Sequence, residues 1–321
     1  MEKTSFYDPV AVRLNRVSER LLTMSDGQQP FIRTLLEHVF SNPGKRVRPA
    51  LTLLTSGYCE HDEAVTETMA TAVEMLHIAT LIHDDTVDDS SMRRGRATIS
   101  SIWGDNAAVL VGDFIFAASA TLVCDTGNIR VIKRFAETIM ELAAGQLQES
   151  SLTYQPHQTM NQYIERIYNK TASLFMTASE SGAVLSGMPE PQTQALREYG
   201  YNLGMAFQII DDILDIEGSA DEIGKPVGSD LSNGIVTLPT LIAIQKNEGV
   251  EFISDLFKDP ENDKLLNDAL GIIRRATILD ESYKVANNYC DLAMECLNVL
   301  PQSDSTVSLS NLIDYIRVRR S

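Results

Sequence analysis

Apolar residues recur every three or four positions over long stretches of this chain. The clearest stretch has repeating positions at Val65, Met69, Ala72, Val73, Leu76 and Thr80. The same spacing returns over residues 132–143 and 203–214. This is the period of an α-helix with one apolar face, whereas the period-two alternation of a strand is not sustained there. The pattern therefore predicts an all-α fold.

Proline and glycine mark the ends of these helical stretches. Proline is excluded from helix interiors, and none occurs between Pro49 and Pro156. Turn-forming clusters fall at residues 41–44, 126–128, 155–157, 188–191 and 218–234. No break reads as an interdomain linker, and no repeat of fixed length is evident. The sequence thus predicts a single domain over residues 1–321.

The segment 107–124, AAVLVGDFIFAASATLVC, is apolar enough to raise the question of a membrane span. Asp113 lies inside it, and its flanks carry no asymmetric positive charge. We therefore expect a buried helix that lines an apolar cavity, and no transmembrane segment. The first fourteen residues lack the apolar stretch of a signal peptide.

Composition excludes some classes of function. The chain has 321 residues, 44% of them hydrophobic, and a formal net charge of -17. An acidic surface repels a phosphate backbone, and no long basic run offsets it, so we expect no nucleic-acid partner. The four cysteines lack the C-x-x-C spacing of a zinc site. They are expected to be reduced thiols in a cytoplasmic protein.

Two clusters of aspartates are the candidate chemistry. The first, HDDTVDD at residues 83–89, ends the helical pattern that starts at residue 65. Asp84 and Asp88 lie one helical turn apart, where two carboxylates on one face repel each other. Mg²⁺ binds oxygen ligands, often one or two carboxylates, and keeps positions open for phosphate oxygens. The cluster is a candidate metal site, although a solvated acidic helix end would carry the same residues.

The second cluster, QIIDDILD at residues 208–215, lies in an apolar segment. Isoleucine and leucine surround its three aspartates, Asp211, Asp212 and Asp215, so the helix that bears them must be largely buried. Buried carboxylates need partners. Two such clusters on separate helices can hold metal ions around one diphosphate and neutralise the charge that develops as it leaves.

Two short basic motifs accompany the aspartates. GKRVRP at residues 44–49 follows a turn and precedes a helix, and RRGR at residues 93–96 follows the first cluster. Either alone is typical of a solvated surface, but beside carboxylates they offer the guanidinium groups and helix N-terminus that bind a diphosphate. Lys170, Lys225 and the basic run 317–320 are weaker candidates. His77 is either turned toward the same cavity or a core histidine.

In this order, the motifs resemble those of the trans-isoprenyl diphosphate synthase, or polyprenyl synthetase, family. The resemblance runs from GKRVRP at residue 44 to TLPTLIA at residue 237. It implies a prenyltransferase that joins isopentenyl diphosphate to an allylic diphosphate with Mg²⁺, three ions accompanying the bound diphosphate. It also implies a homodimer whose subunit is one bundle of antiparallel helices around a deep central cavity.

The resemblance assigns roles to single residues. Those expected to hold Mg²⁺ are Asp84, Asp88 and Asp211, with support from Asp85, Asp212 and Asp215. Those expected to hold the allylic diphosphate are Arg93, Lys170 and Lys225. Those expected to receive isopentenyl diphosphate are Lys45, Arg48, His77 and Arg94. Thr171 and Gln208 match polar residues near the reacting carbon.

Two positions depart from the family pattern. Ala97 replaces the proline of the usual RRGxPT motif, and we expect this change to be tolerated. Ile235 stands where many relatives carry a second lysine that binds phosphate, so that contact is not expected here.

Product length in the family depends on side chains just before the first aspartate cluster. Short-chain relatives carry a bulky aromatic residue there, whereas this chain has Ala79 and Thr80. We therefore expect a long-chain product, with the apolar helix 107–124 as one wall of the cavity. Phe114 or Phe116 would form its floor.

Other classes of protein explain fewer of these residues. A short-chain farnesyl or geranylgeranyl diphosphate synthase would share the motifs and differ at the chain-length positions. A class I terpene cyclase shares the fold, but its second metal site has an Asn/Ser/Glu triad instead of DDILD. A non-catalytic subunit of a two-component synthase would be expected to lose aspartates. A calcium-binding EF-hand would need the alternating ligands and central glycine that DDTVDDSSMRRG lacks.

Overall fold

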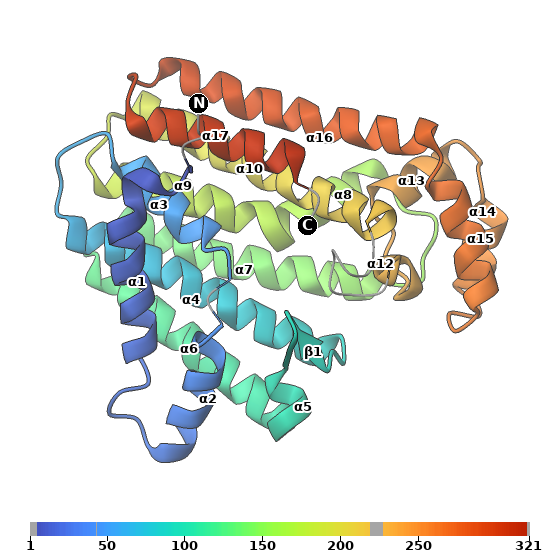
Figure 1. Cartoon of the computed structure of the whole chain (residues 1–321), viewed down its shortest axis with the longest axis horizontal. Coiled ribbons are helices and arrows are strands. Elements are labelled where there is room, and N and C mark those ends of the chain that lie inside the picture. Colours follow the sequence, from blue (N-terminus) through green and yellow to red (C-terminus); the bar gives the residue numbers. More distant parts are fainter. Residues whose placement is uncertain (1–4, 43, 219–226, 320–321) are drawn as a thin grey trace. The chain divides into compact units, whose positions relative to one another are not determined.

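The computed structural model describes residues 5–42, 44–218 and 227–319, and nearly all of its regular structure is helical (Figure 1). The predicted all-α class is confirmed. The chain divides into two compact units. Unit 1 comprises residues 1–139, 174–200 and 297–311, and unit 2 comprises residues 140–173, 201–296 and 312–321. The single domain expected over residues 1–321 stays a prediction.

The helices follow one another with short connections. The first six are α1 (Ala11–Thr23), α2 (Pro30–Phe40), α3 (Val47–Ser56), α4 (Glu63–Val87), α5 (Ile99–Trp103) and α6 (Asp105–Asp125). The next four are α7 (Ile129–Leu152), α8 (Met160–Ile167), α9 (Ser173–Leu185) and α10 (Glu190–Glu217). The last are α12 (Ser229–Ser232), α13 (Leu238–Gln245), α14 (Val250–Leu256), α15 (Asp263–Ile273), α16 (Ala276–Cys296) and α17 (Asp304–Val318). Short 3-10 turns lie at Asp8–Val10 and Leu297–Val299, and a π-helical turn lies at Tyr168–Ala172.

In unit 1, α4 carries the first aspartate cluster at its end. The helix begins after Asp62, whose side chain accepts a hydrogen bond from the backbone N–H of Ala64. Met69, Val73 and Leu76, three of the periodic positions, are fully buried. Helices α3 and α6 pack against α4, so the apolar period of the sequence corresponds to a core face.

Helix α6 is buried on one face only. Val111 and Ile115 face the core, whereas Leu110 is 69% exposed. Among the described residues, α6 is the one helix long and apolar enough to cross a membrane, and 39% of its most apolar window is buried. Gly112 brings α6 close to His83 of α4, where a Cβ atom would find no room. The predicted burial therefore holds for the side against α4, and the opposite side stays apolar and exposed.

A small β-hairpin follows α4, which the hydrophobic pattern does not predict. Strand β1 (Met92–Arg93) pairs antiparallel with β2 (Arg96–Ala97). Between them Arg94 and Gly95 have φ angles of 50° and 75°, as in the two-residue type I′ turn whose twist suits a hairpin. The hairpin lies beyond the end of α4, close to α5 (Figure 1). It therefore brings the RRGR motif back beside the first aspartate cluster.

In unit 2, α8 and the π-helical turn position the next group of functional residues. Helix α8 begins with a capping box, in which Thr159 and Gln162 each accept a hydrogen bond from the other's backbone N–H. The π-helical turn follows directly, and such turns are rare and often found at functional sites. Gly145 of α7 allows close packing, because a Cβ atom there would lie 2.8 Å from the backbone nitrogen of Lys170.

Candidate active site

The first aspartate cluster lies at the C-terminal end of α4. Asp84 belongs to the last turn, and the backbone N–H of Asp88 donates to the carbonyl oxygen of Asp84 at 2.8 Å. Asp88 and Asp89 are exposed, and Asp84 is half-buried. The dipole of a helix is negative at this end, so carboxylates here are unfavourable without a positive partner. The structure thus confirms the one-turn spacing of Asp84 and Asp88 and adds a reason to expect a cation.

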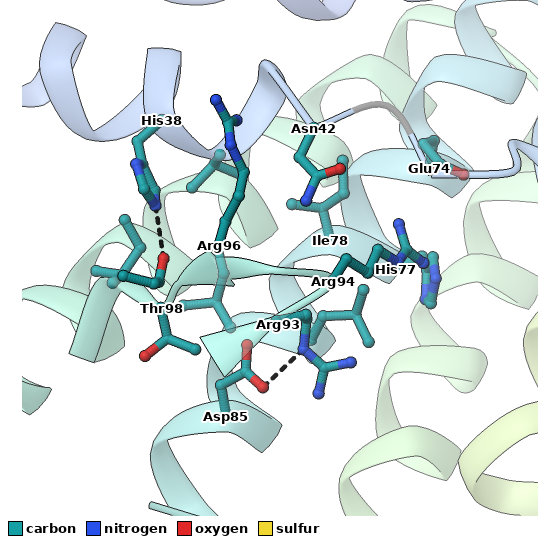
Figure 2. A pocket seen from close by; sticks show the side chains of 15 residues that line it. His38, Asn42, Glu74, His77, Ile78, Asp85, Arg93, Arg94, Arg96 and Thr98 are labelled. Carbon is teal, nitrogen blue, oxygen red and sulfur yellow. Dashed lines mark hydrogen bonds and ion pairs between the residues drawn. The ribbon is translucent and has the colours of Figure 1, made fainter. Parts of the chain in front are cut away.

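Asp85 is turned inward instead. It is 6% exposed, and its Oδ1 accepts a hydrogen bond from Nε of Arg93 at 2.6 Å (Figure 2). Burial raises the pKa of Asp85 above its ordinary value, although the charge of Arg93 and this hydrogen bond act in the opposite direction. The pair ties strand β1 to the end of α4, so Arg93 has a carboxylate partner before any ligand binds.

A cavity of about 90 Å³ opens beside this pair. Figure 2 shows its polar lining, which is formed by Glu74 and His77 of α4 and by Arg93, Arg94 and Arg96 of the hairpin. Aliphatic side chains of α4 form part of the remaining wall. The combination suits a ligand with an anionic group and a short apolar part.

The basic loop before α3 uses one of its arginines internally. Arg46, in the left-handed region at φ 51°, is 8% exposed and forms an ion pair with Glu74 at 2.6 Å. The Arg94 guanidinium lies against Gly44, where a Cβ atom would find no room. Lys45 is exposed. The expectation that both arginines of GKRVRP serve a phosphate is therefore corrected, because Arg46 is taken by a buried carboxylate.

Arg48 and His77 contact each other. Nη1 of Arg48 lies 3.2 Å from Nε2 of His77, and its guanidinium lies 4.5 Å from the centre of the Phe175 ring. Burial, followed by the charge of Arg48, lowers the pKa of His77 well below its ordinary value. A neutral imidazole can accept from Arg48 without adding charge. The predicted His77, Arg48 and Arg94 thus belong to one region of unit 1.

The predicted chain-length residues lie on α4 and α6. Ala79 is fully buried, and the Thr80 hydroxyl donates to the carbonyl oxygen of His77 at 2.7 Å. Phe116 stacks on His83 with ring centroids 6.1 Å apart, and Phe114 is half-buried. The 90 Å³ cavity is lined by other residues of α4, so the role of these four in product length stays a prediction.

The three aspartates of the second cluster have unlike surroundings on α10. Asp211 is half-buried, whereas Asp212 and Asp215 are 3% and 1% exposed. The predicted burial of this segment is confirmed. Asp215 accepts hydrogen bonds from the Ser229 hydroxyl at 2.9 Å and from the backbone N–H of Asp230 at 3.2 Å. Asp215 therefore secures the start of α12.

Both carboxylate oxygens of Asp212 accept hydrogen bonds from within unit 2. The Tyr163 hydroxyl donates to Oδ2 at 2.7 Å, and Nε2 of Gln208 donates to Oδ1 at 2.8 Å. Burial, followed by the charge of Asp230, raises the pKa of Asp212 to about 7. The two donors favour the ionised form but do not outweigh the burial.

The π-helical turn supplies Lys170 and Thr171. The Lys170 ammonium forms an ion pair with Glu149 of α7, which also lies 3.9 Å from Nε of Arg166. The Thr171 hydroxyl donates to Oε1 of Gln208 at 2.6 Å. The predicted Thr171, Gln208 and Asp212 thus form one hydrogen-bonded group.

Asp211 faces a cation from the C-terminal end of the chain. Nη1 of Arg319 lies 2.6 Å from its Oδ1, and the Arg319 guanidinium lies 4.6 Å from the centre of the Phe207 ring. The Arg319 side chain is 14% exposed. Arg319 of the predicted basic run therefore supplies a positive charge to the second cluster.

In the part of the chain that the structure describes, no three Asp, Glu, His or Cys side chains form a metal-binding group. The first cluster instead presents Asp84 and Asp88 at the helix end, and the second presents Asp211. Each cluster by itself suits Mg²⁺, which often takes only one or two carboxylates and completes its shell with water and phosphate oxygens.

Several partners of these residues were not predicted. Four buried residues each contact a motif residue or its neighbour: Glu74, Glu149, Tyr163 and Arg166. A charged residue at an apolar position of a helix is a usable signal, and Glu74 stands between Val73 and Met75. Lys225, predicted to hold a diphosphate, lies outside the described residues.

Comparison with known proteins decides the family. Residues 29–273 match the polyprenyl synthetase family, a span that includes both aspartate clusters and both basic motifs. The chain belongs to the polyprenyl synthetase family. The predicted family is therefore confirmed.

Members of the polyprenyl synthetase family resemble this chain over nearly its full length. Solanesyl-diphosphate synthase 2, chloroplastic, of Oryza sativa subsp. japonica is 35% identical over 97% of this chain and 78% of its own. Heptaprenyl diphosphate synthase component 2 of Geobacillus stearothermophilus is 36% identical over 88% of each chain. Polyprenyl synthase of Caulobacter crescentus CB15, solved with calcium and isoprenyl diphosphate, has a TM-score of 0.92 at 34% identity and covers 98% of this chain and 97% of its own.

Heptaprenyl diphosphate synthase of Staphylococcus aureus is similar in structure. Its TM-score is 0.93 at 33% identity, and the match covers 99% of this chain and 100% of that one. Agreement at this level confirms the fold of the polyprenyl synthetases for this chain.

Proposed function

We propose that this polyprenyl synthetase condenses isopentenyl diphosphate head-to-tail onto an allylic diphosphate, such as farnesyl or geranylgeranyl diphosphate, in a reaction that requires Mg²⁺. The product is an all-trans polyprenyl diphosphate. The observation that carries this proposal is the carboxylate pair Asp84 and Asp88 at the negative end of α4, beside a cavity lined by arginines. An anionic site next to a cationic one suits a metal-bound diphosphate.

The metal ligands follow from the family resemblance and from the exposure of each aspartate. Asp84, Asp88 and Asp211 would hold the Mg²⁺ ions, which neutralise negative charge on the leaving diphosphate when they are bound. Asp85, Asp212 and Asp215 are bonded within the protein. We assign these three the task of fixing the clusters.

The reaction needs no nucleophile from the protein. The allylic C–O bond breaks with its electron pair on the diphosphate, and the isopentenyl double bond forms the new C–C bond to the allylic carbon. A proton then leaves the carbon next to the resulting cation, restores a double bond and passes to the released diphosphate. Arg93 and Lys170 would hold the allylic diphosphate, and Thr171 and Gln208 would lie near the reacting carbon.

The second substrate would bind in unit 1. Arg48, Arg94 and Lys45 would take the diphosphate of isopentenyl diphosphate, and the aliphatic part of the cavity wall suits its short hydrocarbon chain. His77 would stay neutral and fix Arg48 by accepting its hydrogen bond.

We propose a long-chain product. Relatives at 35–37% identity are named solanesyl, heptaprenyl and nonaprenyl diphosphate synthases, and Ala79 is small. Replacing Ala79 with Phe should place an aromatic ring below the first cluster and shorten the product by one or more isoprene units. The length distribution of the dephosphorylated lipids measures this effect. An unchanged distribution would show that Ala79 does not line the cavity that holds the growing chain.

We propose that two copies of the chain associate through the apolar outer face of α6. Val109 and Leu110 are 44% and 69% exposed there, and an apolar helix face of this kind is typical of a subunit contact. Sedimentation of the wild-type chain and of Leu110→Lys tests this assignment, and equal masses for the two would contradict it.

We further place the enzyme in the cytoplasm, whereas plant relatives are named chloroplastic.

The test of the reaction is incubation with farnesyl diphosphate, labelled isopentenyl diphosphate and Mg²⁺, followed by chromatography of the dephosphorylated products. A ladder of long prenyl alcohols that disappears with a chelator is the expected result. A product that stops at the geranylgeranyl length would favour a short-chain synthase, and a cyclic hydrocarbon a terpene cyclase. Turnover only with a second protein added would favour a two-component enzyme.

A further inference from the structure

Tyr163 lies behind the second aspartate cluster and has no part in the reaction as described above. Its side chain is fully buried on α8, and its hydroxyl donates to Oδ2 of Asp212 at 2.7 Å. A buried tyrosine hydroxyl needs a hydrogen-bond partner. Here the partner is a carboxylate next in sequence to Asp211, one of the proposed metal ligands.

The hydrogen bonds that start at Tyr163 have a defined direction. The Tyr163 hydroxyl and the amide NH₂ of Gln208 both donate to Asp212, one to each carboxyl oxygen. Gln208 then has its carbonyl oxygen turned to Thr171, whose hydroxyl donates to it at 2.6 Å. The single proton of the Thr171 hydroxyl is thereby directed to Gln208, and lone pairs of its oxygen remain for other neighbours.

Tyr163 is held in place by the next turn of α8. The guanidinium of Arg166 lies 5.7 Å from the centre of the Tyr163 ring. Nη2 of Arg166 donates to the carbonyl oxygen of Val236 at 2.6 Å, and Nη1 donates to Oε1 of Gln158 at 3.2 Å. Arg166 is itself 3% exposed and hydrogen-bonded on two sides. It therefore restricts the Tyr163 ring, whose hydroxyl stays directed at Asp212.

We propose that Tyr163 is a positioning residue of the prenyl transfer, an inference that rests on the proposed function. Its hydroxyl fixes Asp212, and through Asp212 and Gln208 it sets the direction of the Thr171 hydroxyl. Thr171 therefore presents oxygen lone pairs to the allylic carbon as positive charge develops there. A hydroxyl turned the other way would present its positive end and oppose ionisation of the C–O bond.

Tyr163→Phe tests this inference, with Tyr199→Phe as the matched control. Tyr199 is also fully buried, and its hydroxyl donates to the backbone carbonyl of Leu309 at 2.8 Å. Both variants lose one buried hydrogen bond, so both should lower the melting temperature by similar amounts. Tyr163→Phe alone should lower kcat, by about tenfold, with unchanged KM for both diphosphates. A kcat equal to that of Tyr199→Phe would overturn the proposal.

A double-mutant comparison shows whether Tyr163 acts through Thr171. In a Thr171→Val background no hydroxyl remains to be directed, so Tyr163→Phe should then change kcat by less than about twofold. The same tenfold loss in both backgrounds would show that Tyr163 acts by another route. If the wild-type enzyme makes no prenyl product, the proposed function fails instead, which is a different result from active wild-type and unaffected Tyr163→Phe.

Metal binding provides a readout that does not depend on turnover. If Asp212 is an internal anchor, Asp212→Asn should bind Mn²⁺ with wild-type affinity in an equilibrium titration with farnesyl diphosphate, whereas Asp211→Asn should bind it more weakly. Equal weakening in both variants would make Asp212 a metal ligand. It would overturn the proposal that Asp212 links Tyr163 to Gln208 and Thr171. This comparison remains decisive even where Tyr163→Phe yields too little folded protein.

Discussion

The first aspartate cluster lies at an exposed helix end, whereas the second lies in a buried stretch of α10. In both, the middle aspartate is turned inward: Asp85 is bonded to Arg93, and Asp212 to Tyr163 and Gln208. The last aspartates differ, because Asp88 is exposed while Asp215 is 1% exposed and holds α12.

The comparison shows that one sequence spacing can serve two tasks. Position along the helix decides which carboxylates face outward, but the surrounding elements decide which of them are already bonded. Asp84 and Asp88 of the first cluster lie at the C-terminal end of α4, whereas Asp211 of the second faces Arg319. The same pattern therefore lies at the end of a helix in one region, and in the other it is largely hydrogen-bonded within the protein.

Asp84→Asn should have the largest effect on activity. Loss of a metal ligand should lower kcat by about 10³-fold, because charge on the leaving diphosphate is then neutralised less well. The melting temperature without metal should stay the same or rise slightly, because a carboxylate is removed from the negative end of α4. Steady-state kinetics and thermal unfolding measure the two quantities, and a large loss of stability would contradict the prediction that the Asp84 charge is unfavourable at the C-terminal end of α4.

Asp215→Ala should act on stability instead. It leaves the Ser229 hydroxyl and the backbone N–H of Asp230 without their shared acceptor, which should cost about 2 kcal/mol in the free energy of unfolding. Urea unfolding gives this value. The control is Asp89→Ala at the exposed end of the first cluster, where a change below about 0.5 kcal/mol is expected. Equal losses of unfolding free energy in the two variants would contradict the inference that Asp215 is a structural residue and Asp89 is not.

The two regions should respond to pH with opposite signs. The pKa of His77 is lowered in the folded protein, so the unfolded chain binds more protons and stability falls as pH drops below the unfolded value of about 6.5. The pKa of Asp212 is raised to about 7, so the folded protein binds more protons. The contribution of Asp212 to the free energy of unfolding therefore falls as pH rises from about 4 toward 7.

Metal-free unfolding at several pH values measures both slopes. His77→Gln should flatten the acidic side of the stability profile, and Asp212→Asn should flatten the loss on rising pH. Each change is limited to about 1.4 kcal/mol per pH unit, the value for one proton. A His77→Gln profile that parallels the wild-type one would mean that His77 is not kept neutral by its surroundings.

Arg319→Gln should produce the smallest effect, an increase in metal affinity. Removing the guanidinium frees Asp211 from a competing cation, and loss of one partly exposed ion pair worth about 1 kcal/mol corresponds to about fivefold tighter Mn²⁺ binding. Arg317→Gln is the control, because Arg317 pairs with Asp291 on α16. Tighter binding in the control as well would point to general charge effects.

The sequence predicted the helices and the aspartates because both depend on local spacing. Met69, Val73 and Leu76 form a buried face as their period requires, and Asp84 and Asp88 lie one turn apart. The hairpin was missed because its strands have two residues each, too few to show an alternating pattern. Its one local signal was the dipeptide Arg94-Gly95, which forms the turn.

Partners far apart in the chain could not be predicted from spacing. Arg46 and Glu74 are 28 positions apart, and Tyr163 and Asp212 are 49 apart. Nothing local distinguishes an arginine that binds a ligand from one that neutralises a buried carboxylate. The motif GKRVRP therefore identified a basic loop correctly and overstated the number of its arginines available to a phosphate.

The π-helical turn at Tyr168–Ala172 makes this part of the chain unusually sensitive to length. Such a turn amounts to one extra residue in a regular helix, and each residue of an α-helix rotates its neighbours by about 100°. Deleting a single residue between 168 and 172 would leave an intact, well-formed helix. It would also turn Lys170 and Thr171 away from Glu149 and Gln208. We expect members of the family to keep the number of residues in this turn unchanged.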